Sequence, residues 1–492
     1  MNSLAADLRR VVSSAGIYAA ASVAQRGVAF FLLPIYTRYL APQQYGVLEL
    51  LAAFSSIVFA VLAVGLPSAL TKSYHRDCTD DDDRARILAT SFVIGLPILA
   101  VGSLLLWLFA ADIAFFLVGQ RDAGQLVQLS VLGGLFSSLA AILLSSLRTQ
   151  ERALAFSMLT LVQFTISVSV NILLVAVFQL GVRGVLWGNL AGHAVALPVA
   201  AFVAGRGSKL VPSRRLTWPL ISFGALVVPV ALAGWVMNLS DRYLLRILAD
   251  LDQVAVYGVG YKIGMVIQLV LVWPFQLAWP AISFSISNRP AYKESYAEVL
   301  TYFVAALTYA VVGLSILSRV VLPLLVGREY WGAYRVVPPI ALAYALNGVY
   351  YCISPSVHIG GKTKYLPPLT ALGAISNIVL NLILIPLFGI LGAAWATVFS
   401  FFVLTAGVAV VGQRAHPVAY DYSRLLKIVV CGVAVYALSL SISFGGGVVG
   451  AIWIGLLAAV GFPILLILSG FLRPAEKLAL RKLTGKVLGT ER

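Results

Sequence analysis

Apolar segments long enough to cross a bilayer recur along almost the whole chain, and this feature limits the fold more than any other. A helix that crosses the hydrocarbon core needs roughly 20 mostly apolar residues, and such segments run from near residue 13 to near residue 472. With 60% hydrophobic and 11% charged residues, the chain carries too little charge to cover a soluble surface of this size. We therefore expect an all-α integral membrane protein.

The breaks between these segments predict about fourteen transmembrane helices. We expect spans at residues 13–38, 44–70, 87–111, 124–147, 154–179, 184–205, 217–245, 253–285, 297–325, 332–358, 365–387, 390–412, 423–444 and 449–472. The segment after the short basic start is too long for the core of a signal peptide, so we interpret the first helix as retained. The three cysteines have no metal-ligand spacing, and neither a metal nor another cofactor is expected.

Lysine and arginine gather in alternate loops, and this sets the orientation because cytoplasmic loops collect these residues. If the N-terminus lies in the cytoplasm, most of the 35 basic residues fall in cytoplasmic segments, among them residues 72–86, 206–215 and 473–492. The bias predicts an even number of helices and two cytoplasmic termini. It also accounts for the net charge of +16, so no nucleic-acid partner is expected.

Paired landmarks about 210 residues apart indicate an internal repeat. The pairs, first copy before second, are Tyr45-Gly46 and Tyr257-Gly258, Leu117-Val118-Gly119 and Leu325-Val326-Gly327, Asn171 and Asn381, Phe178 and Phe388, and Gly184 and Gly392. Each copy covers six predicted helices. Because six is an even number, both copies enter the membrane from the same side, as in parallel-repeat transporters.

The repeat predicts the division of the chain. We expect a bundle of six helices at residues 1–212, a second bundle of six at residues 213–418, and two further helices with a basic cytoplasmic tail at residues 419–492. The two bundles would face each other across a central cavity that opens to either side in turn. This is the arrangement of an alternating-access carrier.

Motifs spread over most of the chain resemble those of one membrane-protein family. They are Phe31–Leu40 running on to Gln44-Tyr45-Gly46, Ser240–Tyr243 followed by Tyr257–Lys262, Gly361–Lys364, and Asn381–Gly389. Together they resemble the polysaccharide transporter branch of the multidrug/oligosaccharidyl-lipid/polysaccharide exporter (MOP) superfamily, the Wzx-type flippases. The motifs mark this family well and its substrate poorly.

The resemblance implies a function in cell-surface polysaccharide biosynthesis. A member of this family would carry an undecaprenyl-pyrophosphate-linked oligosaccharide from the cytoplasmic to the outer leaflet of a bacterial inner membrane, for O-antigen or exopolysaccharide synthesis. Its partners would be membrane lipids, a polysaccharide polymerase and the chain-length machinery. The peptidoglycan precursor would suit the same fold, and no residue separates the two substrates.

Cations inside the predicted helices are the candidate substrate-binding residues. A charge at the bilayer centre costs at least about 3 kcal/mol, so such a side chain usually faces the bundle interior and marks a function. Arg26 and Lys262 reach a similar depth in their helices, where they could meet the pyrophosphate of a lipid carrier. We also assign substrate contact to Tyr261, the neighbour of Lys262, and to Arg242 at the outer end of its helix.

Two acids are the candidates for ion coupling and gating. Glu49 matches Tyr261 in the register of the repeat, so it is expected beside Lys262 or Arg26. It would either form a structural ion pair or bind a coupling proton or sodium ion. Asp241 would pair with Arg242, or gate the outward opening with it.

Prolines and one acidic run have structural interpretations. Pro274 and Pro280 each remove a backbone hydrogen bond from their helix, so they are the expected hinges of a rocking element. The run Asp80–Asp83 is interpreted as a solvated cap of the following helix rather than a divalent-cation site.

Two other classes of function would need residues that this sequence lacks. A multidrug or organic-cation antiporter of the same superfamily should attract its substrate with buried carboxylates, whereas the cations Arg26 and Lys262 here face one acid, Glu49. A membrane glycosyltransferase or polymerase usually holds catalytic acids in a long loop. The longest polar loop, near residues 71–86, has no acid–base pair suited to catalysis. No enzyme activity and no catalytic residue are therefore expected.

Overall fold

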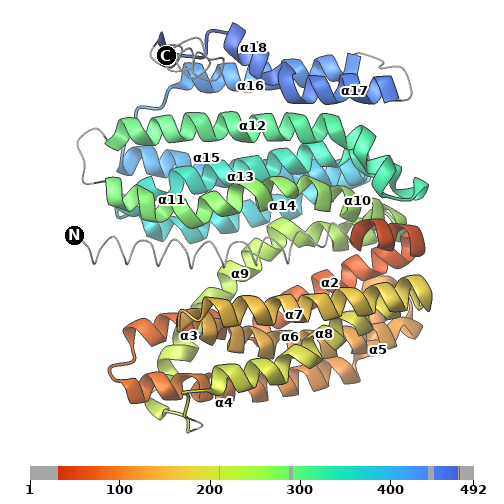
Figure 1. Ribbon diagram of the computed structural model, residues 1–492, viewed down its shortest axis with the longest axis vertical. Helices are drawn as coiled ribbons and strands as arrows, with labels where there is room; N and C mark the ends of the chain where they lie inside the picture. The colour runs from red at the N-terminus through yellow and green to blue at the C-terminus, as the bar shows by residue number, and fades with distance from the viewer. Residues whose placement is uncertain (1–31, 210, 288–291, 442–447, 475, 477–492) are drawn as a thin grey trace, which may run out of the picture. The chain divides into compact units, whose positions relative to one another are not determined.

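The computed structural model describes residues 32–209, 211–287, 292–441, 448–474 and 476 (Figure 1). Its chain forms two compact units. The first contains Met1–Lys262, Leu325–Ala333 and Pro367–Val403, and the second contains Ile263–Leu324, Tyr334–Leu366 and Leu404–Arg492. Regular structure in the described ranges is helical throughout, which confirms the all-α prediction.

The first unit is built from helices that precede residue 263 and from parts of three later helices. In chain order it holds a helix at 32–39, α2 (Pro42–Leu62), α3 (Leu66–Arg76), α4 (Asp81–Leu108), α5 (Ala110–Val118), η1 (Arg121–Ala123), α6 (Gly124–Thr149), α7 (Ala153–Ile172), η2 (Leu173–Val177), α8 (Gly181–Gly205), α9 (Arg214–Leu248), most of α10 (Leu251–Gly264), most of η4 (Arg328–Arg335), most of α14 (Leu366–Phe388) and half of α15 (Ile390–Ala415).

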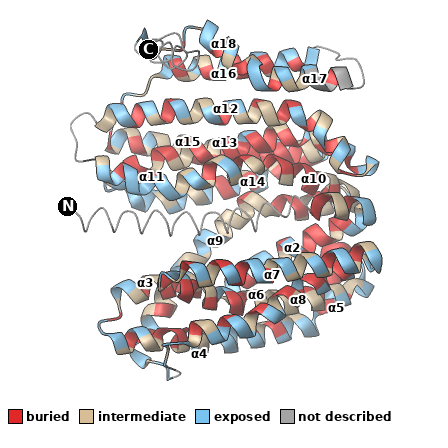
Figure 2. Ribbon diagram, in the orientation of Figure 1, coloured by how far each residue is buried: buried red, intermediate tan, exposed pale blue. Residues whose placement is uncertain are grey.

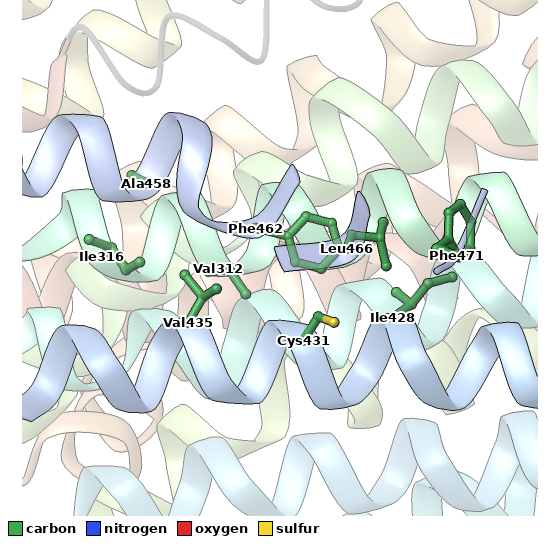
Figure 3. Close-up of a cluster of buried hydrophobic side chains, with 9 residues drawn as sticks. All are labelled: Val312, Ile316, Ile428, Cys431, Val435, Ala458, Phe462, Leu466 and Phe471. Carbon is green, nitrogen blue, oxygen red and sulfur yellow. The ribbon is translucent and has the colours of Figure 1, made fainter. Parts of the chain in front are cut away.

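The second unit holds the remaining helices. They are η3 (Gln268–Val272), α11 (Trp273–Ile286), most of α12 (Tyr292–Leu325), α13 (Val337–Ile359), η5 (Thr363–Tyr365), the end of α15, α16 (Tyr422–Ser441), α17 (Val448–Leu456), η6 (Leu457–Gly461) and α18 (Phe462–Leu468). An apolar cluster in this unit joins α12 to α16 and α18. Figure 3 shows Val312, Cys431 and Phe462 packed together in this cluster.

Twelve segments in the described ranges are long and apolar enough to cross a membrane. They correspond to the second through thirteenth predicted spans. Most of the first predicted span, 13–38, lies outside the described residues. The last one, 449–472, contains the shorter apolar helix Trp453–Leu468. The chain is thus a multi-pass membrane protein, and the count of fourteen stays a prediction.

Exposed apolar side chains cover the helices that face away from each unit's core. On α4, Val93, Val101 and Leu108 are all more than half exposed, and Figure 2 shows exposed residues along this helix. A water-soluble protein rarely exposes so much apolar surface. The pattern is expected where lipid covers the surface.

The first described span contains a break that sequence periodicity did not predict. Val64 and Gly65 between α2 and α3 have positive φ angles of 46° and 60°. The carbonyl oxygen of Val64 lies so close to α9 that a Cβ at Gly224 would come within 2.1 Å of it. Two glycines therefore allow the broken segment and α9 to approach each other closely.

Two further departures from the predicted helices concern short elements. The residues after 111 were expected to form a loop, but Ala110–Val118 forms α5, whose last residue accepts a hydrogen bond from Arg246 of α9. The predicted span 253–285 changes helix type at the π-helical η3, directly before Pro274 in the first turn of α11. Pro280 lies inside α11. The hinge role of both prolines stays a prediction.

The acidic run caps α4. The Asp80 side chain accepts a hydrogen bond from the backbone N–H of Asp83 at 2.7 Å, which satisfies one free donor of the first turn. Asp82 pairs with Arg86 and Lys209. Within the described residues, no group of three potential ligands could hold a metal ion.

Small residues let repeat-related helices pack at close range. A Cβ at Gly184 on α8 would lie 3.1 Å from the backbone of Leu174, and one at Gly392 on α15 would lie 2.1 Å from the carbonyl oxygen of Leu384. These two glycines are partners in the sequence repeat. Each therefore allows a close approach to the helical segment that precedes it in its own copy.

Candidate functional site

Helices α2, α9 and α10 bring four charged side chains together inside the first unit. Glu49 of α2 accepts hydrogen bonds from Arg242 of α9, at 3.2 Å from Nε, and from Lys262 of α10 through its other carboxylate oxygen. Arg242 also pairs with Asp241, at 3.0 Å from Nη1 to Oδ1. We call Glu49, Asp241, Arg242 and Lys262 the charged network.

The charged network is balanced and almost fully buried. It contains two acids and two bases, so its formal charge is zero. The side chains of Glu49, Asp241 and Arg242 are at most 7% exposed, whereas that of Lys262 is 26% exposed. Lys262 is therefore the member that a ligand could reach with the least rearrangement.

Three tyrosines complete the surroundings of these charges. Lys262 Nζ donates to the Tyr45 hydroxyl at 2.7 Å, and the Tyr257 hydroxyl donates to Asp241. The Arg242 guanidinium lies 4.4 Å from the centre of the Tyr261 ring, within the range of a cation–π interaction. Tyr45 and Tyr257 are fully buried, so their hydroxyl groups contribute polar partners that water cannot supply.

Helix α9 is anchored to α2 by further hydrogen bonds. The Tyr243 hydroxyl donates to the carbonyl oxygen of Leu50 at 3.1 Å, and Trp235 Nε1 donates to that of Ala53 at 3.0 Å. Both bonds are made to the α2 backbone just beyond Glu49. They fix the register in which Arg242 meets Glu49.

Two glycines permit the close contact between α2 and α10. A Cβ at Gly46 of α2 would lie 2.3 Å from the carbonyl oxygen of Leu251, at the start of α10. In return, a Cβ at Gly258 of α10 would lie 2.9 Å from the Glu49 carboxyl carbon. Gly46 and Gly258 are partners in the sequence repeat, so the two copies of the motif pack against each other.

The site residues expected from sequence fall into three groups. Lys262, Tyr261, Arg242, Glu49 and Asp241 come together in one cluster. Arg26 lies outside the described residues. Pro274 and Pro280 lie in the second unit and are not part of the cluster.

Tyr45 and Tyr257 were not expected in the site. The available signal was their recurrence at the head of two repeat-related helices, which we had used as a landmark of the repeat alone. Their contacts with Lys262 and Asp241 give that recurrence a chemical reason.

The arrangement can act as a latch between helices of the two repeats. Removing one partner from a buried ion pair costs about 3–5 kcal/mol because a charge is left without compensation. Moving α2 away from α9 and α10 would separate these ion pairs and require this free energy. The requirement would be smaller if another ion, a proton or water replaced the lost partner. A ligand with negative charge could replace Glu49 beside Lys262.

Comparison with known families places these features in context. The sequence model of a family described as "Polysaccharide biosynthesis protein" matches residues 11–285, more than half of the chain. A relative from Haloferax volcanii, the "Probable low-salt glycan biosynthesis flippase Agl15", is 23% identical over 407 residues, which are 82% of this chain and 84% of the relative.

Solved structures share the fold. The lipid II flippase MurJ in an inward closed conformation matches with a TM-score of 0.72 and 15% identity, over 91% of this chain and 97% of that one. An inward-facing multidrug resistance MATE family transporter of the MOP superfamily matches with a TM-score of 0.65 and 14% identity, over 82% and 96%. An outward-facing MATE structure matches with a TM-score of 0.60 and 15% identity, over 82% and 95%.

Proposed function

This chain belongs to the family of polysaccharide biosynthesis proteins and is a flippase-type transporter of the MOP superfamily, and we propose that its cargo is an undecaprenyl-pyrophosphate-linked oligosaccharide. The cargo would move from the cytoplasmic to the outer leaflet by alternating access. The pathway served would be O-antigen or exopolysaccharide synthesis.

The charged network is the observation that supports this proposal most strongly. A pyrophosphate brings concentrated negative charge into the membrane and needs cationic partners there. Lys262 has the exposure to meet it, and its carboxylate partner, Glu49, can be displaced by a second anion. Arg26 is the second proposed cation for the same group, with Tyr261 beside Lys262.

Partner exchange at Lys262 would connect substrate binding to the opening of the latch. When the pyrophosphate forms an ion pair with Lys262, Glu49 remains paired with Arg242. Its carboxylate could then bind a proton or a sodium ion, which is the coupling role that we propose for it. Asp241 and Arg242 would act as the gating pair, because their contacts join α9 to both α2 and α10.

The proposed topology, domain division and membrane rest on the sequence. Both termini would lie in the cytoplasm, because the basic loops do. The working parts would be the bundles at residues 1–212 and 213–418, with residues 419–492 attached, and Pro274 and Pro280 would be hinges. The membrane would be a bacterial inner membrane, with a polymerase and chain-length proteins as partners for the exported product.

Reconstituted flipping tests the function. Proteoliposomes are loaded with fluorescent undecaprenyl-pyrophosphate oligosaccharide, and the fraction accessible to a reagent in the outer leaflet is followed in time. We expect transport by the wild type and a loss of at least tenfold in Lys262→Ala. Arg121→Ala is the matched control, because its exposed pair with Asp112 lies outside the network.

Two other substrates decide between this proposal and its alternatives. Transport of lipid II at the same rate would move the assignment to the peptidoglycan precursor. Uptake of an organic cation against a proton or sodium gradient, without flipping of any lipid-linked sugar, would identify a multidrug antiporter.

A further inference from the structure

A recess that combines amide and apolar side chains lies at the ends of α2, α5, α8 and α10, and its lining includes Val47, two residues before Glu49. Its cavity of about 580 Å³ falls in the typical range of ligand pockets, roughly 300–1,000 Å³. The lining includes Gln43, Gln44, Gln120 and Gln179, with Arg183 as its charged residue. We call this cavity the glutamine recess.

A second cavity of about 390 Å³ shares part of this lining, including Gln43 and Gln120. Here Gln43 Nε2 donates to Asp252 at 2.8 Å. Two buried atoms of its walls, Arg246 Nε and Asp252 Oδ1, have no hydrogen-bond partner among the described residues. Hydrogen-bonding capacity is therefore left unused beside the recess, which is uncommon for buried groups.

Backbone strain marks one residue of the recess. Gln179 follows Phe178 and has a φ of +52°, a left-handed conformation that costs a non-glycine residue energy. In the second repeat, the residue after Phe388 is Gly389, with a φ of +55°. The same turn thus recurs in both repeats, and only the second one uses glycine.

The space beside the turn is open in the first repeat and filled in the second. A Cβ at Gly389 would lie 2.8 Å from the Gln253 side chain, so the space beside this turn is filled. Beside Gln179 lies the open recess. Likewise, the exposed Gln43 and Gln44 that precede Tyr45 correspond to the less exposed Ala255 and Val256 that precede Tyr257.

The chemistry of the recess selects among ligands. Each glutamine amide offers two donors and an acceptor, which matches the mixed donors and acceptors of sugar hydroxyl groups. The lining of the glutamine recess contains no carboxylate, so it does not favour a cation. Apolar residues, among them Val47, Leu126 and Leu180, make up the rest of the lining, so hydrogen bonds to a bound head group would come from the four amides and Arg183.

We infer that the glutamine recess binds the oligosaccharide head of the transported lipid at the predicted outer face. This inference rests on the proposed function and deepens it by assigning a subsite to the sugar. Gln43 lies on the first turn of α2, two turns before Glu49, and Leu251 lines the recess while its carbonyl oxygen meets Gly46. Sugar bound there would contact both helices that the latch joins.

The test compares two lipids that share one carrier. Flipping rates in proteoliposomes are measured for undecaprenyl pyrophosphate carrying one N-acetylglucosamine and for the same carrier with a pentasaccharide built on that residue. The wild type should favour the pentasaccharide. Gln179→Gly, which copies the second repeat, and Gln120→Ala should each lower the pentasaccharide-to-monosaccharide ratio by at least fivefold.

Glu151→Gly is the matched control for Gln179→Gly. Glu151 also has a positive φ, of 57°, but it does not line the recess, so the substitution relieves the same kind of strain and should leave the ratio unchanged. Melting temperatures of all variants check folding. If the wild type flips both lipids and the ratio is the same in every variant, the recess assignment is wrong and the proposed function stands. If the wild type flips neither lipid, the proposed function itself fails.

Discussion

The two repeats of this chain form the same backbone at two places and use different residues there. After Phe178 the first repeat places Gln179 in a left-handed turn, and after Phe388 the second places Gly389 in the same turn. One turn beyond the tyrosine landmarks, the first repeat has Glu49 where the second has Tyr261. The shared backbone reports what the fold needs, and the unshared residues indicate where the repeats have separate functions.

The largest expected effect concerns the acid that only the first repeat possesses. In Glu49→Ala, Arg242 and Lys262 each lose the buried carboxylate of Glu49 as a partner. The free energy of unfolding should fall by about 3–5 kcal/mol, and flipping should be lost. The measurement is denaturant unfolding in detergent micelles together with the flipping rate.

The control for that substitution is the repeat-related position. Tyr261→Phe keeps the ring that lies against Arg242 and removes a hydroxyl that donates to Asn238 at 3.4 Å. Its cost should be about 1 kcal/mol. Equal losses at the two positions would contradict a special role for the first repeat's acid.

The two glycines at the close contact between α2 and α10 should differ in how much an alanine substitution destabilises the chain. A methyl group at Gly46 meets the Leu251 backbone, which cannot move aside, whereas one at Gly258 meets the Glu49 side chain. Gly46→Ala should cost about 1–3 kcal/mol through overpacking, and Gly258→Ala should cost less. Unfolding of the two variants under identical conditions checks the order, and a larger cost for Gly258→Ala would show that Glu49 is held more rigidly than the backbone.

The left-handed turns should respond in opposite directions. Gln179→Gly relieves strain and should stabilise the chain by about 1 kcal/mol. Gly389→Ala introduces the same strain and brings a methyl group toward Gln253, so it should destabilise the chain by at least about 1 kcal/mol. Thermal melting of both variants would reveal whether the signs are opposite. Two changes of the same sign would contradict the repeat-based comparison.

The smallest effect is expected for a residue that belongs neither to the charged network nor to the left-handed turns. Arg121→Ala breaks an exposed ion pair with Asp112, and such pairs contribute about 0–1 kcal/mol. Its stability and flipping rate should match those of the wild type. A clear loss would show that the assays respond to surface charge in general.

Sequence alone predicted the twelve long apolar helices of the described residues, because a bilayer imposes one length and one composition on each crossing. It also offered Lys262 as one of two partners for Glu49, with Arg26 as the other, and the structure shows the pair with Lys262. It did not predict that Arg242 pairs with Glu49, since this contact joins residues 193 positions apart through the packing of α9 on α2.

Other features could not be predicted from the sequence because they also depend on tertiary contacts. The break at Val64 depends on a carbonyl group that lies against Gly224, and α5 is too short to show a clear period. The glutamine recess is formed by four chain segments whose residues have no common motif. The strain at Gln179 becomes visible only when the φ angles of the two repeats are compared.

The most direct test is to cross-link α2 to α10, so that the latch cannot open. In a chain whose native Cys78, Cys352 and Cys431 are replaced by serine or alanine, cysteines are placed at Gln43 of α2 and Asp252 of α10, whose native side chains are hydrogen-bonded at 2.8 Å, and are joined by a thiosulfonate cross-linker long enough to replace both side chains. Because Gln43 lines the glutamine recess, flipping is measured for the carrier with one N-acetylglucosamine, after cross-linking and again after reduction. Flipping should stop in the cross-linked chain and return with the reductant. Undiminished flipping by fully cross-linked protein would contradict the latch, because α2 and α10 would then not need to separate.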